Sequence, residues 1–138
     1  DGTWSPFDIV GHLIHGEKTD WIPRANIILA GDATKTFESF DRFAQFEASK
    51  AQSISKLLEH FEQLRNQNII VLDSLDLNKS TLQMKAQHPE LGTVNLAQLL
   101  SCWVAHDISH INQITRVLAK NFSLAVGPWK QYLTLLSS

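Results

Sequence analysis

The chain has 138 residues, of which 43% are hydrophobic and 19% charged, a composition typical of one folded domain and not of a disordered segment. Twelve basic residues stand against 14 acidic ones and are scattered along the chain, which disfavours a nucleic-acid partner, because such binders concentrate positive charge on one face. No apolar run approaches the roughly 20 residues that span a bilayer, no segment reads as a signal peptide, and the single cysteine excludes an intrachain disulfide. We therefore expect a reducing, cytoplasmic compartment and no membrane partner.

The first predicted helix opens at Ser5, a good N-cap, with Pro6 at the first helical position and Asp8 placed to close a capping box. Apolar residues then recur at helical spacing. Pro23 interrupts this pattern and predicts a kink or restart near residues 19–20, because proline cannot donate a backbone hydrogen bond.

The middle of the chain has a less regular pattern. Gly31 is expected to end the first helical unit, and the aromatic residues of segment 37–46 recur every three positions, which fits either a helical turn or an irregular loop. An amphipathic pattern predicts a long helix over 49–72. Alternating residues at 82–86 predict a short extended piece before the last long helix.

That last long helix is predicted to begin at Asn95, with Gln98 as its capping-box partner, and to end near Asn121. Apolar residues cover more than half of its circumference, so we expect it to be the central, most buried helix. A short helix over 129–136 should follow. The sequence thus predicts an all-α fold with little strand.

The strongest chemical signal is a pair of histidines on the last long helix. His106 and His110 stand four residues apart, so their Cβ atoms lie about 5–6 Å apart on one face and both imidazoles can reach one metal ion. The alternative is two ordinary core histidines, each with its own hydrogen-bond partner. Asp107 follows His106 where zinc proteases of the His-Glu-x-x-His type have glutamate, which argues against that mechanism.

A third ligand must come from another helix. His12 is the first candidate, because it lies among the apolar positions of the first helix, and His15 and Glu17 are the alternatives. We expect His15 and Glu17 to face solvent. Glu17 and Gln113 are also candidates to hydrogen-bond the ligating imidazoles and fix their tautomers.

Two stretches carry a family resemblance. The first is WSPFDIVGHLIHGE at 4–17, and the second is HPELGTVNL at 88–96, followed by WVAHD at 103–107 and HINQI at 110–114. Together they cover about a third of the chain, and they resemble, in order and spacing, the second and last bundle helices of the DinB/YfiT-like family.

The resemblance implies a DinB/YfiT-like four-helix bundle as a single domain over 1–138, with a divalent metal held by His12, His106 and His110. That family has a helix before the Trp-Ser motif, whereas this chain begins just before it. The expectation is therefore that the first bundle helix is lacking, or that a partner chain covers the face it would occupy. Family members commonly form homodimers, and we expect one here.

Three neutral nitrogen ligands leave a coordination position open, as in catalytic zinc sites. Imidazole suits several metals, and we expect zinc or nickel ahead of iron or manganese. The family resemblance implies an enzyme with a small-molecule substrate. The leading hypothesis is transfer of a low-molecular-weight thiol, with a metal-dependent hydrolase as the alternative and a non-catalytic, stress-related metal-binding protein as the third possibility.

Overall fold

The computed structural model describes residues 4–136. Its elements, in chain order, are α1 (Pro6–Thr19), α2 (Trp21–Leu29), α3 (Ala44–Ser49), α4 (Ile54–Ser74), α5 (Lys79–Leu82), β1 (Lys85–His88), β2 (Gly92–Asn95), α6 (Leu96–Lys120) and the 3₁₀ helix η1 (Gly127–Tyr132). Within this part of the chain, no helix combines the length and the apolar character needed to cross a bilayer.

The start of the first helix is formed as predicted. The Ser5 hydroxyl oxygen accepts a bond from the backbone N–H of Asp8, and the Asp8 carboxylate accepts one from the backbone N–H of Ser5 at 2.9 Å. The predicted restart is also present, since α1 ends at Thr19 and α2 begins at Trp21. Pro23 has no N–H for the carbonyl of Thr19, which explains the break.

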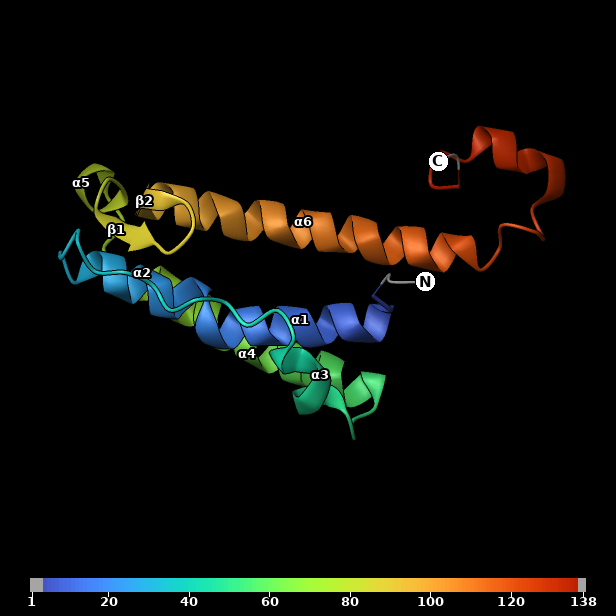
Figure 1. Ribbon diagram of the computed structural model, residues 1–138, viewed down its shortest axis with the longest axis horizontal. Helices are drawn as coiled ribbons and strands as arrows, with labels where there is room; N and C mark the ends of the chain where they lie inside the picture. The colour runs from blue at the N-terminus through green and yellow to red at the C-terminus, as the bar shows by residue number, and fades with distance from the viewer. Residues whose placement is uncertain (1–3, 137–138) are drawn as a thin grey trace.

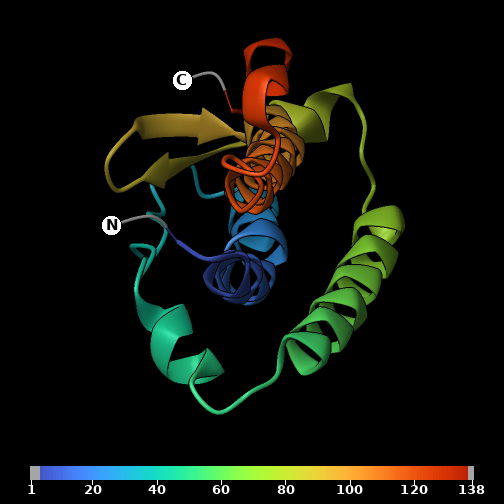
Figure 2. The ribbon, with the colours of Figure 1, turned by 90° about the vertical axis from the view of Figure 1, so that its right-hand side faces the viewer.

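α1 and α2 follow each other end to end and form a rod at the centre of the molecule (Figure 1). α1 packs against α3, α4 and α6, while α2 packs against α6 and β1. Seen end-on, α6 and α4 lie on different sides of this rod (Figure 2). Two clusters of buried side chains form the core: one around Trp21, Ile28 and Leu96, between α2, α6 and the hairpin, and one around Ile14 and Leu57, between α1 and α4.

The extended piece predicted at 82–86 is only partly present, because Leu82 ends α5 and the strand β1 covers Lys85–His88. This strand is half of a hairpin. β1 and β2 pair antiparallel, from Lys85 opposite Asn95 to His88 opposite Gly92. Gly92 has φ +74°, a conformation that favours glycine. A parallel bridge between Thr36 and Gln87 fastens the long α2–α3 connection to this hairpin. Segment 37–46 is therefore mainly an irregular loop, and α3 occupies only its end.

The prediction that α6 is the central, most buried helix is wrong. Its Asn95–Gln98 capping box is formed as expected, but only Leu96, Leu99 and Trp103 are buried, all within its first eight residues. Further along, the exposed apolar side chains include Val104, Ile108, Ile111 and Leu118. These side chains show that the apolar face of α6 is uncovered, and the surface area of 9034 Å², against roughly 7,200 Å² for a compact chain of this mass, is consistent with an open structure. The homodimer expected from the family resemblance stays a prediction.

Two other boundaries differ from expectation. The helix expected over 49–72 begins later, at Ile54, because the Ser53 hydroxyl oxygen caps it by accepting a bond from the backbone N–H of Lys56. The short helix expected over 129–136 is instead the 3₁₀ helix η1.

Charged and polar side chains link α1, α4 and α6. Arg65 of α4 lies 2.7 Å from the Glu17 carboxylate of α1 and 2.8 Å from the Asp107 carboxylate of α6. Asn68 donates to the second Glu17 oxygen at 2.9 Å. The Glu17 side chain is fully buried, so these partners, and not water, compensate its negative charge. We refer to Arg65, Glu17, Asp107 and Asn68 as the interhelix brace.

Replacing Arg65 by methionine should destabilise the fold by about 3–5 kcal/mol, because it leaves the buried Glu17 carboxylate without its counter-charge. Urea unfolding measures this loss. The double variant Arg65→Met/Glu17→Gln should recover part of it, since the unpaired charge is gone. Lys50→Met, which removes an exposed ion pair with Glu47, is the control and should have little effect. Equal losses for Arg65→Met and Lys50→Met would contradict the brace.

Candidate metal centre

Three histidines from two helices meet between α1 and α6. The Nε2 atom of His106 lies 3.2 Å from Nε2 of His12 and 3.1 Å from Nε2 of His110. One ring nitrogen from each of these residues lies within 4.8 Å of the others, so the group could hold a metal ion. The four-residue spacing in α6 brings His106 and His110 to one face, and the packing of α1 on α6 brings His12 to them.

The hydrogen bonds of His110 fit a metal ligand. Its Nδ1 lies 2.9 Å from Oε1 of Gln113, an oxygen that can only accept, so Nδ1 carries the proton. In the neutral ring, Nε2 then has a free lone pair, and it faces the other two imidazoles. The Nδ1 atoms of His12 and His106 are buried and have no hydrogen-bond partner in the described part of the chain.

The same surroundings keep two of the rings neutral. Burial, followed by the charge of His110, lowers the pKa of His12 to about 3 and that of His106 to about 4. Neutral imidazole is the form that binds metals, so both rings are ready to act as ligands at neutral pH.

Aromatic rings pack against two of the three histidines. Trp4 and Phe40 lie 4.9 and 5.3 Å from the His12 ring, between centroids, and Trp21 lies 5.1 Å from the His106 ring. Trp21 in turn stacks on Trp103 at 5.5 Å, with nearly parallel planes. These contacts hold the His12 and His106 rings from several sides.

The other histidine and acidic candidates lie elsewhere. His15 is half-buried against Phe40, 4.8 Å between ring centroids, and is not among the three that converge. Glu17 was expected to face solvent, but it is 2% exposed, and its hydrogen bonds go to Arg65 and Asn68. Cys102, the single cysteine, is exposed.

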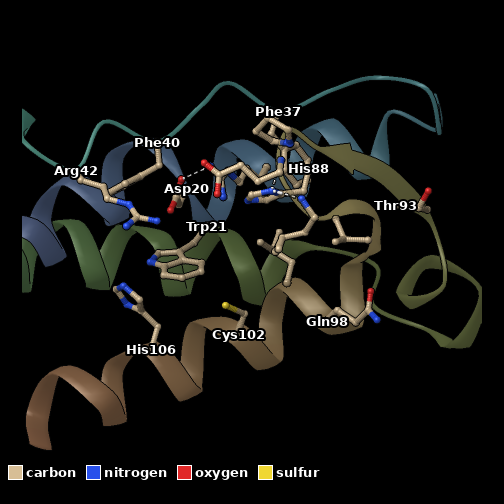
Figure 3. A pocket seen from close by; sticks show the side chains of 16 residues that line it. Asp20, Trp21, Phe37, Phe40, Arg42, His88, Thr93, Gln98, Cys102 and His106 are labelled. Atoms are coloured by element: carbon tan, nitrogen blue, oxygen red, sulfur yellow. Dashed lines mark hydrogen bonds and ion pairs between the residues drawn. The ribbon is translucent and has the colours of Figure 1, made fainter.

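Beside the three histidines lie two adjacent hollows. The smaller, of about 330 Å³, includes all three histidines in its wall. The larger, of about 730 Å³, runs from His106 past Trp21 and Cys102 to the β1–β2 hairpin (Figure 3). Both hollows share Asp20, Phe40, Arg42 and His106 in their walls, and the larger is of the size that holds small molecules. We call the larger one the main cavity.

Comparisons with known proteins place this arrangement in a family. A family model described as the DinB superfamily matches residues 1–114. The chain belongs to the DinB superfamily. Its structure is similar to YfiT from Bacillus subtilis, with a TM-score of 0.73 and 24% sequence identity, over 87% of this chain and 68% of that chain. No curated protein matches the chain.

YfiT is described as a probable metal-dependent hydrolase with an unusual four-helix bundle topology. This likeness confirms the expected fold class, and the match to the family model confirms the expected family. Both of its resemblance stretches lie within the matched residues, and together they contain the three histidines.

Several residues around the centre had no clear signal in the sequence. Arg65 is an ordinary polar-face residue of an amphipathic helix, and its role depends on how α4 packs. Arg42 and Phe40 lie in segment 37–46, where aromatic residues recur every three positions. This pattern did not indicate that the segment lines the centre. Asp20 lies at the helix break predicted from Pro23, and that break brings it to both hollows.

The metal-free protein should lose stability as the pH falls from about 6.5 towards 4. His12 and His106 bind protons more weakly when folded than when unfolded, so protons favour the unfolded chain in this range. Each group contributes at most about 1.4 kcal/mol per pH unit. Urea unfolding in chelator at several pH values measures the slope. The double variant His12→Gln/His106→Gln should have a flatter slope, and an unchanged slope would contradict these lowered pKa values.

Proposed function

We propose that this DinB protein is a divalent-metal-dependent enzyme that activates a low-molecular-weight thiol for transfer to a small-molecule acceptor. His12, His106 and His110 would hold the metal, with zinc or nickel as the first expectation and iron or manganese as the next. The observation that carries the proposal is the convergence of three Nε2 atoms from two helices beside a cavity of about 730 Å³.

A metal held by three neutral imidazoles with an open position lowers the pKa of a thiol or water that binds there, and so makes either a nucleophile near neutral pH. The protein supplies the geometry. Gln113 orients the His110 ring through Nδ1, and the Trp21 ring supports His106. The main cavity then gives the acceptor a place beside the nucleophile.

The carboxylates around the centre favour a thiol over water. A thiol is ionised by coordination itself, whereas activating water commonly also uses a free carboxylate base. Glu17 and Asp107 are both bound to Arg65, and Asp20 lies 3.0 Å from Arg24. None of these three carboxylates is free to accept a proton without breaking an ion pair.

Hydrolysis is the second candidate, because the structurally similar YfiT is described as a probable metal-dependent hydrolase. In this alternative Asp20 is the base. It lines both hollows, and burial raises its pKa above the ordinary value, which makes it a better proton acceptor than an exposed aspartate.

Metal content tests the site itself. Purified protein should contain about one divalent ion per chain, and His12→Ala or His106→Ala should reduce its affinity for that ion at least tenfold, because each removes one of three ligands. Mass spectrometry of the metals and a competition titration measure both. His60→Ala, which changes a histidine of α4 outside the three, is the control and should retain the metal. Unchanged metal content and affinity in both His12→Ala and His106→Ala would contradict the proposed site.

Activity distinguishes the reaction classes. Metal-loaded protein should consume a low-molecular-weight thiol together with an electrophilic acceptor and should leave simple esters and amides intact. Asp20→Asn should reduce this transfer less than tenfold, since the thiol needs no base there. Ester or amide hydrolysis that Asp20→Asn abolishes would favour the hydrolase instead. A metal-loaded protein without either activity would support a non-catalytic role.

A further inference from the structure

We propose that the substrate accepted beside the three histidines is an anion, and that Arg42 binds its carboxylate or phosphate group while the main cavity holds an apolar or aromatic body. This inference rests on the proposed function, because it names the class of substrate that would meet the centre. It follows from the charges and the shape of the cavity.

Arg42 lies in the wall between the two adjacent hollows. It lines both of them, together with Phe40 and His106, and in Figure 3 its guanidinium group points into the space between Asp20 and His106. Among residues 4–136, no hydrogen bond or ion pair is formed by its side chain. An arginine fork without a partner at the edge of a cavity is well suited to carboxylate or phosphate.

The other charges near the cavity leave Arg42 uncompensated. Arg24 also lines the cavity, but it is 8% exposed, and its Nη2 atom lies 3.0 Å from Asp20 and 3.3 Å from the carbonyl oxygen of Glu38. Asp20 is thus neutralised by Arg24 and not by Arg42. The remaining acidic residue in the wall, Glu90, lies in the β1–β2 turn, at the hairpin end of the cavity.

The middle of the cavity suits an apolar or planar body. Trp21, Phe37 and Leu99 contribute to its wall and are themselves buried, so they form a rigid apolar surface. The volume of about 730 Å³ exceeds what a simple anion needs and is within the range of sites for small organic molecules. A ligand that reaches His106 at one end therefore extends towards the hairpin.

The hairpin end offers hydrogen-bond donors. Nδ1 of His88 accepts bonds from the backbone N–H groups of Glu90 and Leu91, at 3.1 and 3.2 Å, so the neutral ring carries its proton on Nε2. Gln98 also lines this end, whereas the Thr93 hydroxyl donates to Oε1 of Gln87 at 3.1 Å and offers no free donor. The ligand indicated by these features has an anionic group near the three histidines, an apolar middle and a hydrogen-bond acceptor at its far end.

Calorimetric titration of the full chain with small probes tests this assignment. The probes are 3-phenylpropionate, phenyl phosphate and the neutral 3-phenylpropionamide, each measured with zinc-loaded and with chelator-treated protein. The variants are Arg42→Gln and, as a matched control, Arg116→Gln, which removes an exposed arginine of α6 outside the cavity.

At least one anion should bind about tenfold or more tightly than the amide, and Arg42→Gln should weaken that anion about tenfold or more, as expected for a charge-assisted hydrogen bond. Arg116→Gln should have no such effect. The anion that binds more tightly distinguishes a carboxylate substrate from a phosphate. Equal binding of anion and amide, or an anion affinity that Arg42→Gln leaves unchanged, would overturn the proposal.

Chelator treatment separates this proposal from the proposed function. Because Arg42 is not one of the metal-binding candidates, its preference for an anion should persist in the chelator-treated protein. If the protein binds no metal but loses its preference for the anion in Arg42→Gln, the anion site is supported and the proposed metal-dependent enzyme is contradicted. Anion binding that requires zinc and ignores Arg42 would overturn the anion site and retain the metal.

Discussion

The structure around the centre depends on three imidazole rings that the packing of α1 against α6 brings into contact. Because Gln113 holds the proton of His110 on Nδ1, the inward Nε2 atom has a lone pair, and this atom lies 3.1 Å from Nε2 of His106. Hydrogen bonds among neutral rings need one proton for each contact, whereas one cation satisfies three inward lone pairs at once. Burial further opposes protonation of His12 and His106. These constraints together favour a shared metal ion.

The interhelix brace holds this geometry in place. Asp107 follows His106 in α6, and Glu17 lies little more than one turn after His12 in α1. Arg65 of α4 therefore joins the two helices that carry the three histidines, close to the imidazoles. The stacked pair of Trp21 and Trp103 adds a second, apolar link between α2 and α6. The position of the rings thus depends on tertiary packing and not on the two helices alone.

Local rules predicted much of the fold. The caps at Ser5 and Asn95 involve residues three positions apart, so the sequence shows them directly, and Pro23 likewise marks the helix break. Burial was harder to predict. The apolar circumference of α6 indicates what the helix could bury, but what covers it is a tertiary property, and so Val104 and Ile108 are exposed.

The site divides in the same way. The spacing of His106 and His110 and the family resemblance selected the three histidines that converge, and their binding of metal remains a prediction. Arg65 was not identified, because its partners Glu17 and Asp107 lie far away in sequence. Arg42 was not identified, because the cavity that it lines is built from distant segments of the chain. Glu17 was placed in solvent for the same reason, since its counter-charge lies 48 residues further along the chain. Pair contacts of this kind leave no periodic pattern in a single sequence.

Anomalous diffraction from crystals grown with zinc and without chelator tests the central claim most directly. The account predicts one strong anomalous peak about 2.0–2.1 Å from Nε2 of His12, His106 and His110, with at least one coordination position not filled by the protein. The absence of a peak between these rings, or an ion closed off by a fourth protein ligand, would contradict it.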